Sequence, residues 1–85
     1  MKVYVVVEDW ANDGDDGASV LGVYSTEKLA RNKLERTIKA LEKSGSLFET
    51  VVKGEMYFDS YTDGFYSTEH ERLYIEPAII DEEIK

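Results

Sequence analysis

Residues 20–43 read VLGVYSTEKLARNKLERTIKALEK, and this stretch decides the fold because it contains the change from strand to helix. Its first five residues are mostly β-branched or aromatic, which favours a strand. Ser25 or Thr26 can cap a helix, and Glu27 suits the positive end of a helix dipole. Residues at helical spacing then predict one face that packs on a sheet, made of Ala30, Leu34, Thr37, Ile38 and Leu41, with Leu29 beside it.

A hairpin is expected before this helix, which should span about 26–43 because Ser44-Gly45 supplies its stop. The run from Val3 to Val7 is apolar on both faces, so we expect it to be a central strand. Turn-forming residues at 12–17 then predict a long acidic loop, after which residues 20–24 resume the sheet.

A third strand is expected after the helix, at residues 50–58. Side chains alternate between the two faces of a strand, which predicts Val52, Met56 and Phe58 on one face. Glycine inside a strand often marks an irregularity, so Gly54 is expected to form a bulge.

The last strand should run from His70 to about Ile80, and Pro77 predicts an edge or a bend there because proline has no N–H to donate. The fold class is therefore α+β, with the order ββαββ. We expect a two-layer sandwich in which one amphipathic helix packs on a mainly antiparallel four-stranded sheet. Residues 1–85 should form a single domain.

Composition indicates a soluble, cytoplasmic protein. The chain has 85 residues, 42% of them hydrophobic, and contains no cysteine, so disulfides and thiolate metal ligands are excluded. No stretch approaches the ~20 apolar residues of a membrane span. The first apolar run is shorter than the roughly 7–15 residues that form the core of a signal peptide.

Catalytic chemistry is not expected, and neither is a cofactor. The single histidine, His70, lies among Glu69, Glu71 and Arg72 and is expected at the surface. Carboxylates are so abundant that no single pair stands out. General acid–base catalysis needs a carboxyl group whose pKa is shifted by burial, usually in a pocket, and a small domain has little interior for one.

The acidic loop has some features of a calcium site, because Asp13, Asp15 and Asp16 cluster in a loop that contains glycine. The EF-hand spacing fails, since Val23 stands at the twelfth position, where a bidentate glutamate is needed. At most a weak cation site at 12–17 is expected, and a solvated turn is the preferred interpretation.

Charge is distributed unevenly along the chain. The helix carries six basic and three acidic residues, a net of +3, whereas the whole chain carries −8, which leaves −11 outside the helix. This distribution is typical of a solvated surface, with Glu35 pairing with Arg31 and Lys39 along the helix. A protein partner with a basic surface is the alternative interpretation, while direct binding to nucleic acid is disfavoured because phosphates would be repelled.

Aromatic residues are concentrated in residues 57–66, where Tyr57, Phe58, Tyr61, Phe65 and Tyr66 alternate with Asp59 and Asp63. A strand with period two cannot bury all of them. Either the tyrosines cover the open face of the sheet while Phe58 and Phe65 enter the core, or they are anchors for a partner. An aromatic patch could also close a homodimer.

Three stretches resemble a family of small uncharacterised bacterial and phage proteins: residues 3–6, residues 22–30, and a last strand ending near residues 79–81. The family begins with a V-Y-x-V strand and continues with G-V-Y-S-x-E-x-A at the junction of strand and helix. The resemblance implies this fold and brings no catalytic residues. Residues 57–71 have no counterpart in it, so a partner-specific surface is expected there.

The leading hypothesis is a non-enzymatic, acidic protein-binding module. A phage association would make it an inhibitor that occupies the nucleic-acid site of a host defence nuclease, of the anti-CRISPR or anti-restriction type, in the host cytoplasm. The residues expected to bind the partner are Asp13, Asp15, Asp16, Tyr57, Asp59, Tyr61, Asp63, Tyr66, Glu69 and Glu71. The alternative is a homo-oligomeric accessory domain that uses a sheet edge or the aromatic face.

Overall fold

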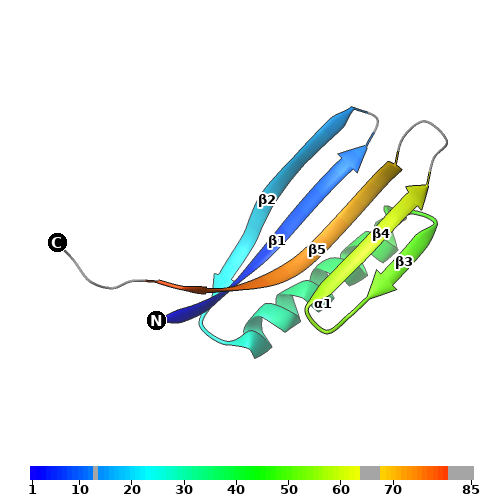
Figure 1. The fold of residues 1–85 in the computed structure, drawn as a ribbon. Helices are drawn as coiled ribbons and strands as arrows, with labels where there is room; N and C mark the ends of the chain where they lie inside the picture. The colour runs from blue at the N-terminus through cyan, green and yellow to red at the C-terminus, as the bar shows by residue number, and fades with distance from the viewer. Residues whose placement is uncertain (13, 64–67, 81–85) are drawn as a thin grey trace.

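The computed structural model describes residues 1–12, 14–63 and 68–80, and it shows one helix against one face of a five-stranded antiparallel sheet (Figure 1). The predicted α+β class is confirmed. The strand order in the sheet is β2-β1-β5-β4-β3, so β5 is central and β2 and β3 are the edges. The elements are β1 (Lys2–Asn12), β2 (Asp15–Tyr24), α1 (Glu27–Ser44), β3 (Thr50–Lys53), β4 (Tyr57–Asp63) and β5 (Thr68–Ile79).

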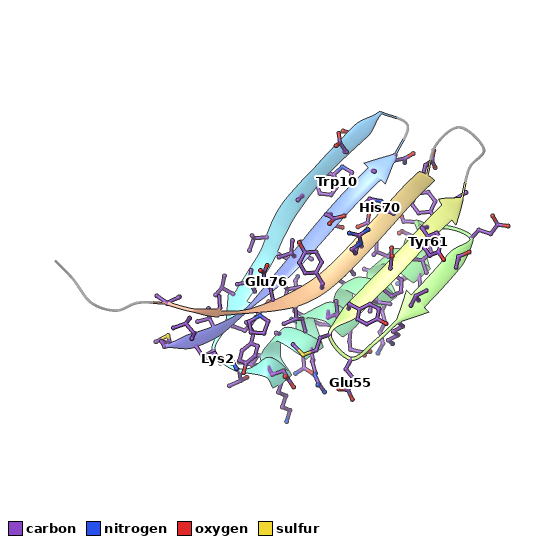
Figure 2. All side chains as sticks on the ribbon, in the orientation of Figure 1. Lys2, Trp10, Glu55, Tyr61, His70 and Glu76 are labelled. Carbon is purple, nitrogen blue, oxygen red and sulfur yellow. The ribbon has the colours of Figure 1, made fainter. Side chains whose placement is uncertain are left out.

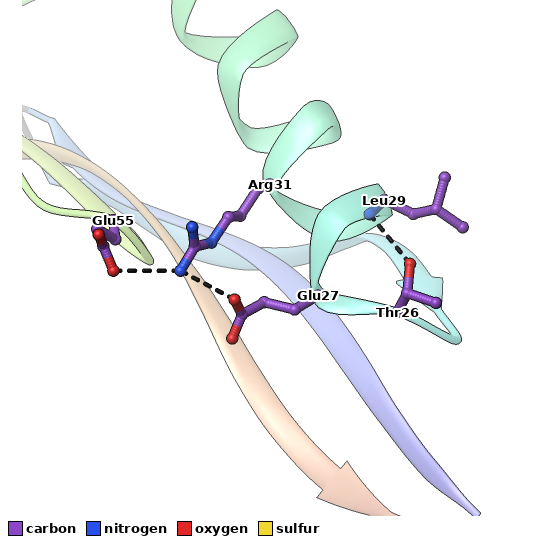
Figure 3. Close-up of polar contacts among 5 residues, drawn as sticks. All are labelled: Thr26, Glu27, Leu29, Arg31 and Glu55. Atoms are coloured by element: carbon purple, nitrogen blue, oxygen red, sulfur yellow. Dashed lines mark hydrogen bonds and ion pairs between the residues drawn. The ribbon is translucent and has the colours of Figure 1, made fainter.

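Helix α1 begins and ends as its local sequence predicts. The Thr26 hydroxyl accepts a hydrogen bond of 3.2 Å from the Leu29 N–H, as Figure 3 shows, and thereby caps the first turn. Gly45 ends the helix in the left-handed conformation, with φ at 71°, which glycine adopts without steric strain. Within the described chain no helix is both long enough and apolar enough to cross a membrane.

Ion pairs of the helix differ from those predicted. Glu35 approaches Lys53 of β3 at 3.6 Å, whereas pairing with Arg31 and Lys39 was expected. Arg31 instead binds Glu27 at 2.9 Å and Glu55 at 3.2 Å (Figure 3). The helix lies against the sheet, so carboxylates and bases from the β3–β4 hairpin compete with the pairs inside the helix.

The predicted third strand is two strands, which corrects the expected count from four to five. Residues 54–56 form a tight turn between β3 and β4, closed by a 2.9 Å hydrogen bond from the Gly54 N–H to the Tyr57 carbonyl. Gly54 therefore marks a hairpin and no bulge. Because the chain reverses there, Lys53 lies opposite Phe58, and Val52 points to the other face, contrary to the prediction.

The hairpin of β1 and β2 is longer than predicted. The two strands stay paired up to Asn12 and Asp15, so most of the expected acidic loop is strand. Gly14 has φ at 84°, a value that suits glycine in a short hairpin turn. Among the described residues no group of three or more His, Asp or Glu side chains could hold a metal ion.

Strand β1 is flanked on both sides, as its apolar sequence predicts, but β5 is not an edge strand. Pro77 pairs with Tyr4 of β1 and lies beyond the end of β4, whose pairing with β5 stops at Tyr57 and Tyr74. Proline is therefore tolerated because β5 has a neighbour on only one side at that point.

The hydrophobic core lies between α1 and the sheet. Its members come from the helix stripe and from alternate positions of the strands, and β5 contributes Leu73 and Ile75. Burial of this kind of side chain supplies most of the stability of a small domain. The buried cluster is made of Val6, Ala30, Leu34, Ile38, Phe58, Leu73 and Ile75.

Candidate functional site

The sheet has one face that no other described element covers, which we call the open face (Figure 1). Directly opposed residues of antiparallel strands share a face, so the pairing register identifies its members. They form rows that cross the sheet from β2 to β4. The rows are Val20, Val7, Tyr74 and Tyr57; then Ala18, Asp9, Arg72 and Asp59; then Asp16, Ala11, His70 and Tyr61.

An ionic cluster lies in the middle of this face. Asp9 Oδ1 is 2.7 Å from His70 Nε2, and Asp9 Oδ2 is 3.6 Å from Arg72 Nη1. Arg72 also lies directly between Asp9 and Asp59 in the register. The side chain of His70, which was expected at the surface, lies on this uncovered face and is half-buried, with 23% of it exposed, as is that of Asp9. Strand β5 is central, so its neighbours β1 and β4 cover the histidine on both sides.

Tyrosines border the ionic cluster. Tyr57 is 47% exposed and lies opposite Tyr74, while Tyr61 lies opposite His70 (Figure 2). Phe58 is fully buried against the helix, which confirms its predicted place in the core. The open face thus combines partly exposed aromatic rings with paired charges, a composition that is common in protein interfaces.

The residues predicted to bind a partner do not all lie on one face. Asp16, Tyr57, Asp59 and Tyr61 belong to the open face, whereas alternation places Asp15, Glu69 and Glu71 on the side of the helix. The sequence alone could not show which of these residues share a face, because that assignment requires the partner of each residue in the neighbouring strand. Asp13 and Tyr66 lie outside the described residues, and Asp63 ends β4 without a described side chain.

Glu71 is the carboxyl group with the most unusual environment. It lies on the helix side between Trp10 and Ser60, and burial raises its pKa to about 8, with help from a hydrogen bond to Glu8 and from the charges of Glu8 and Asp9. Its Oε1 atom is buried and has no hydrogen-bond partner among the described residues. Near neutral pH this carboxyl group is therefore largely protonated.

A groove of about 440 Å³ runs beside Glu71, between the tip of the β1–β2 hairpin and the end of α1. Trp10 and Phe48 are the aromatic residues that line it, and Asp15 lines it as well. No carboxyl group stands out in the sequence, because Glu71 acquires its environment only when β1 pairs with β5. Asp9, Arg72 and Glu8 were missed for the same reason.

The chain belongs to a family described as a domain of unknown function (DUF7336), and the match covers residues 1–79. A search of curated proteins found no match, and neither did a search of solved structures. The predicted resemblance to an uncharacterised family is therefore confirmed at that level. The family assigns no activity to any of the residues described above.

Proposed function

We propose that this DUF7336 domain is a non-enzymatic, acidic protein-binding module of the cytoplasm, whose open face binds a protein partner with a basic surface. One observation carries the proposal: the tyrosines of β4 and two predicted acidic residues, Asp16 and Asp59, lie together on the uncovered face. Tyrosine rings bury a large area at a low entropic cost, and they are enriched among the residues that dominate binding energy.

Electrostatics favours approach of a cationic partner to this face. The chain carries −8, and six of its ten basic residues belong to the segment of α1, which covers the opposite face of the sheet. A basic partner is therefore attracted to the strands and repelled by the helix. Long-range attraction of this kind accelerates association and weakens as salt is added.

A finer form of the proposal makes the domain an inhibitor that occupies the nucleic-acid site of a nuclease, of the anti-CRISPR or anti-restriction type. Acidic side chains at an aromatic surface would replace the phosphates and bases that such a site binds. Direct binding of the domain to DNA or RNA is not expected, because phosphates would meet a net negative surface.

Affinity capture with matched variants tests the proposal. The immobilised domain is exposed to bacterial lysate at low salt, and bound proteins are eluted with a salt gradient or with duplex DNA. A specifically retained basic protein should be lost with Tyr61→Ala and should elute at lower salt with Asp59→Asn. Elution by duplex DNA would support the finer form of the proposal.

Glu42→Gln is the matched control, because it removes one negative charge from the exposed surface of α1, on the other side of the molecule. It should leave retention unchanged. Equal effects of Asp59→Asn and Glu42→Gln would show that only net charge matters, and retention that survives Tyr61→Ala would remove the open face from the proposal.

A further inference from the structure

The two edges of the sheet differ in length and in protection. Strand β3 has four residues and ends with Lys53, and short charged edges of this kind resist pairing with another strand. Strand β2 has ten residues, and no backbone hydrogen bond from another described segment reaches its outer edge. An exposed edge presents a row of N–H and C=O groups that can pair with a further strand.

The exposed segment of β2 contains no charge. Residues 17–24 read GASVLGVY, and Val20 and Val23 on the open face are 60% and 55% exposed. The chain has a net charge of −8, so two copies repel each other over most of their surface. Along the uncharged segment of β2 they can approach without direct repulsion. An acidic surface elsewhere favours basic partners, but this uncharged edge does not select for them.

One exposed apolar side chain of α1, that of Leu29, lies beside this edge. Arg31 and Glu35 pair with Glu55 and Lys53, which places their side of the helix toward the β3–β4 hairpin. Leu29 lies on the other side of the helix from Arg31 and Glu55, as Figure 3 shows, and it is 46% exposed. The exposed leucine therefore lies on the side of β2.

We propose that β2 pairs antiparallel with β2 of a second copy, so that two five-stranded sheets join into one sheet of a symmetric dimer. A two-fold interface is self-complementary, and antiparallel pairing of a strand with itself meets that condition. This inference shares only Asp16 with the proposed function, because the outer edge of β2 lies apart from Tyr57, Asp59 and Tyr61 of β4.

The irregularity in β2 specifies the register. Pairing with β1 shifts between Val6 and Val7, where Leu21 is the extra residue of β2. Centring the second copy on residues 17–24 pairs Ala18 with Val23 on the open face and Ser19 with Gly22 on the helix side. Both of these pairs then share a face in the two copies, and the irregular residue Leu21 lies opposite Val20 of the other copy, beside the two-fold axis.

Charges at the ends of the segment are complementary in this register. Asp15 and Asp16 of one copy meet Ser25 and Thr26 of the other, directly before its helix. The positive pole of a helix dipole and the exposed Lys28 lie there, and both attract carboxylates. The acidic end of β2, which would oppose a parallel arrangement, therefore supports the antiparallel one.

Light scattering over a dilution series tests the dimer, with paired lysine variants at the two edges. The wild-type chain should reach twice its mass of 9.7 kDa at high concentration. Val20→Lys should raise the dimer dissociation constant by about tenfold or more, since the two-fold axis introduces each lysine twice. Val51→Lys makes the same change on β3, where the valine is 47% exposed, and should leave the dimer unchanged.

A cross-linking variant gives a second measurement, because the chain contains no cysteine. Two copies of Val20→Cys at the axis should form an intermolecular disulfide under mild oxidation, whereas Val51→Cys should not. A wild-type chain that stays monomeric at all concentrations and no cross-link through residue 20 would overturn the proposal. Such a result would indicate that the irregularity at Leu21 prevents the edge of β2 from pairing with another strand. A dimer that Val51→Lys disrupts and Val20→Lys does not would assign the interface to β3.

Discussion

Charged residues of β5 are stabilised in different ways on the two faces of the sheet. On the open face, the carboxylate of Asp9 lies 3.6 Å from the Arg72 guanidinium, a pair of opposite charges, and it also contacts the ring of His70. On the helix side, Glu71 lies near another carboxyl group, Glu8, and has no cation as partner among the described residues. Its burial is accommodated by protonation, which raises its pKa.

The comparison shows how a single strand supplies two chemical surfaces. Side chains of β5 point alternately to the packed layer beneath the helix and to the solvated open face. The same residue type would therefore have a different environment if it were moved by one position. On the helix side stability depends on packing and on the proton of Glu71. On the open face it depends on weaker, screened ion pairs, which leaves that face free to bind.

The largest expected effect is a difference in the loss of unfolding free energy between truncations on the helix side and on the open face of β5. Leu73→Ala removes a fully buried side chain from the core and should cost about 2–5 kcal/mol of unfolding free energy. Tyr74→Ala, one residue along on the open face, should cost about 1 kcal/mol or less. Urea denaturation of both variants checks the difference. Equal losses would show that the open face is packed as tightly as the core.

An intermediate effect is expected from Glu71→Gln. The folded-state pKa of about 8 lies above the ordinary value of 4.5, so the folded chain holds the proton more tightly than the unfolded chain. The stability that this group contributes is complete below pH 4.5 and is lost as the pH rises toward 8. Glutamine remains neutral and should remove that loss.

Thermal unfolding across pH measures this change. At pH 9, Glu71→Gln should raise Tm by roughly 4–8 °C, or about 1 kcal/mol, well below the full value of the shift because the side chain is partly solvated. At pH 4 the two proteins should unfold alike. Glu69→Gln, on the same side of β5, serves as control, and a gain that is independent of pH would contradict the assignment.

The smallest effect is expected from Asp9→Asn, which breaks the contacts to His70 and Arg72. The cost should be about 1 kcal/mol at low salt and should shrink as salt screens the pair. Since the charge of Asp9 contributes to the raised pKa of Glu71, the same substitution should also lower that pKa. Asp16→Asn, exposed on the same face, should do neither, as unfolding curves at two salt concentrations would show.

Local signals explain what sequence reasoning predicted correctly. The cap at Thr26 acts across three residues and the stop at Gly45 within one turn, so the helix could be placed almost to the residue. The prediction failed at Gly54, where the alternating pattern on both sides was compatible with one strand or with a hairpin. The hydrogen bond between Gly54 and Tyr57 decides between them, and composition alone carries no signal for it.

By itself the sequence determined the α+β class, the helix and its ends, the apolar β1, and a charge that is basic on the helix and acidic elsewhere. Each of these depends on residues close together in the chain. Only the tertiary structure decided that Asp9 meets His70, 61 residues away, and that Glu71 is buried beside Glu8. The physical reason is that strand pairing assigns every side chain to a face, and that pairing joins segments from opposite ends of the chain.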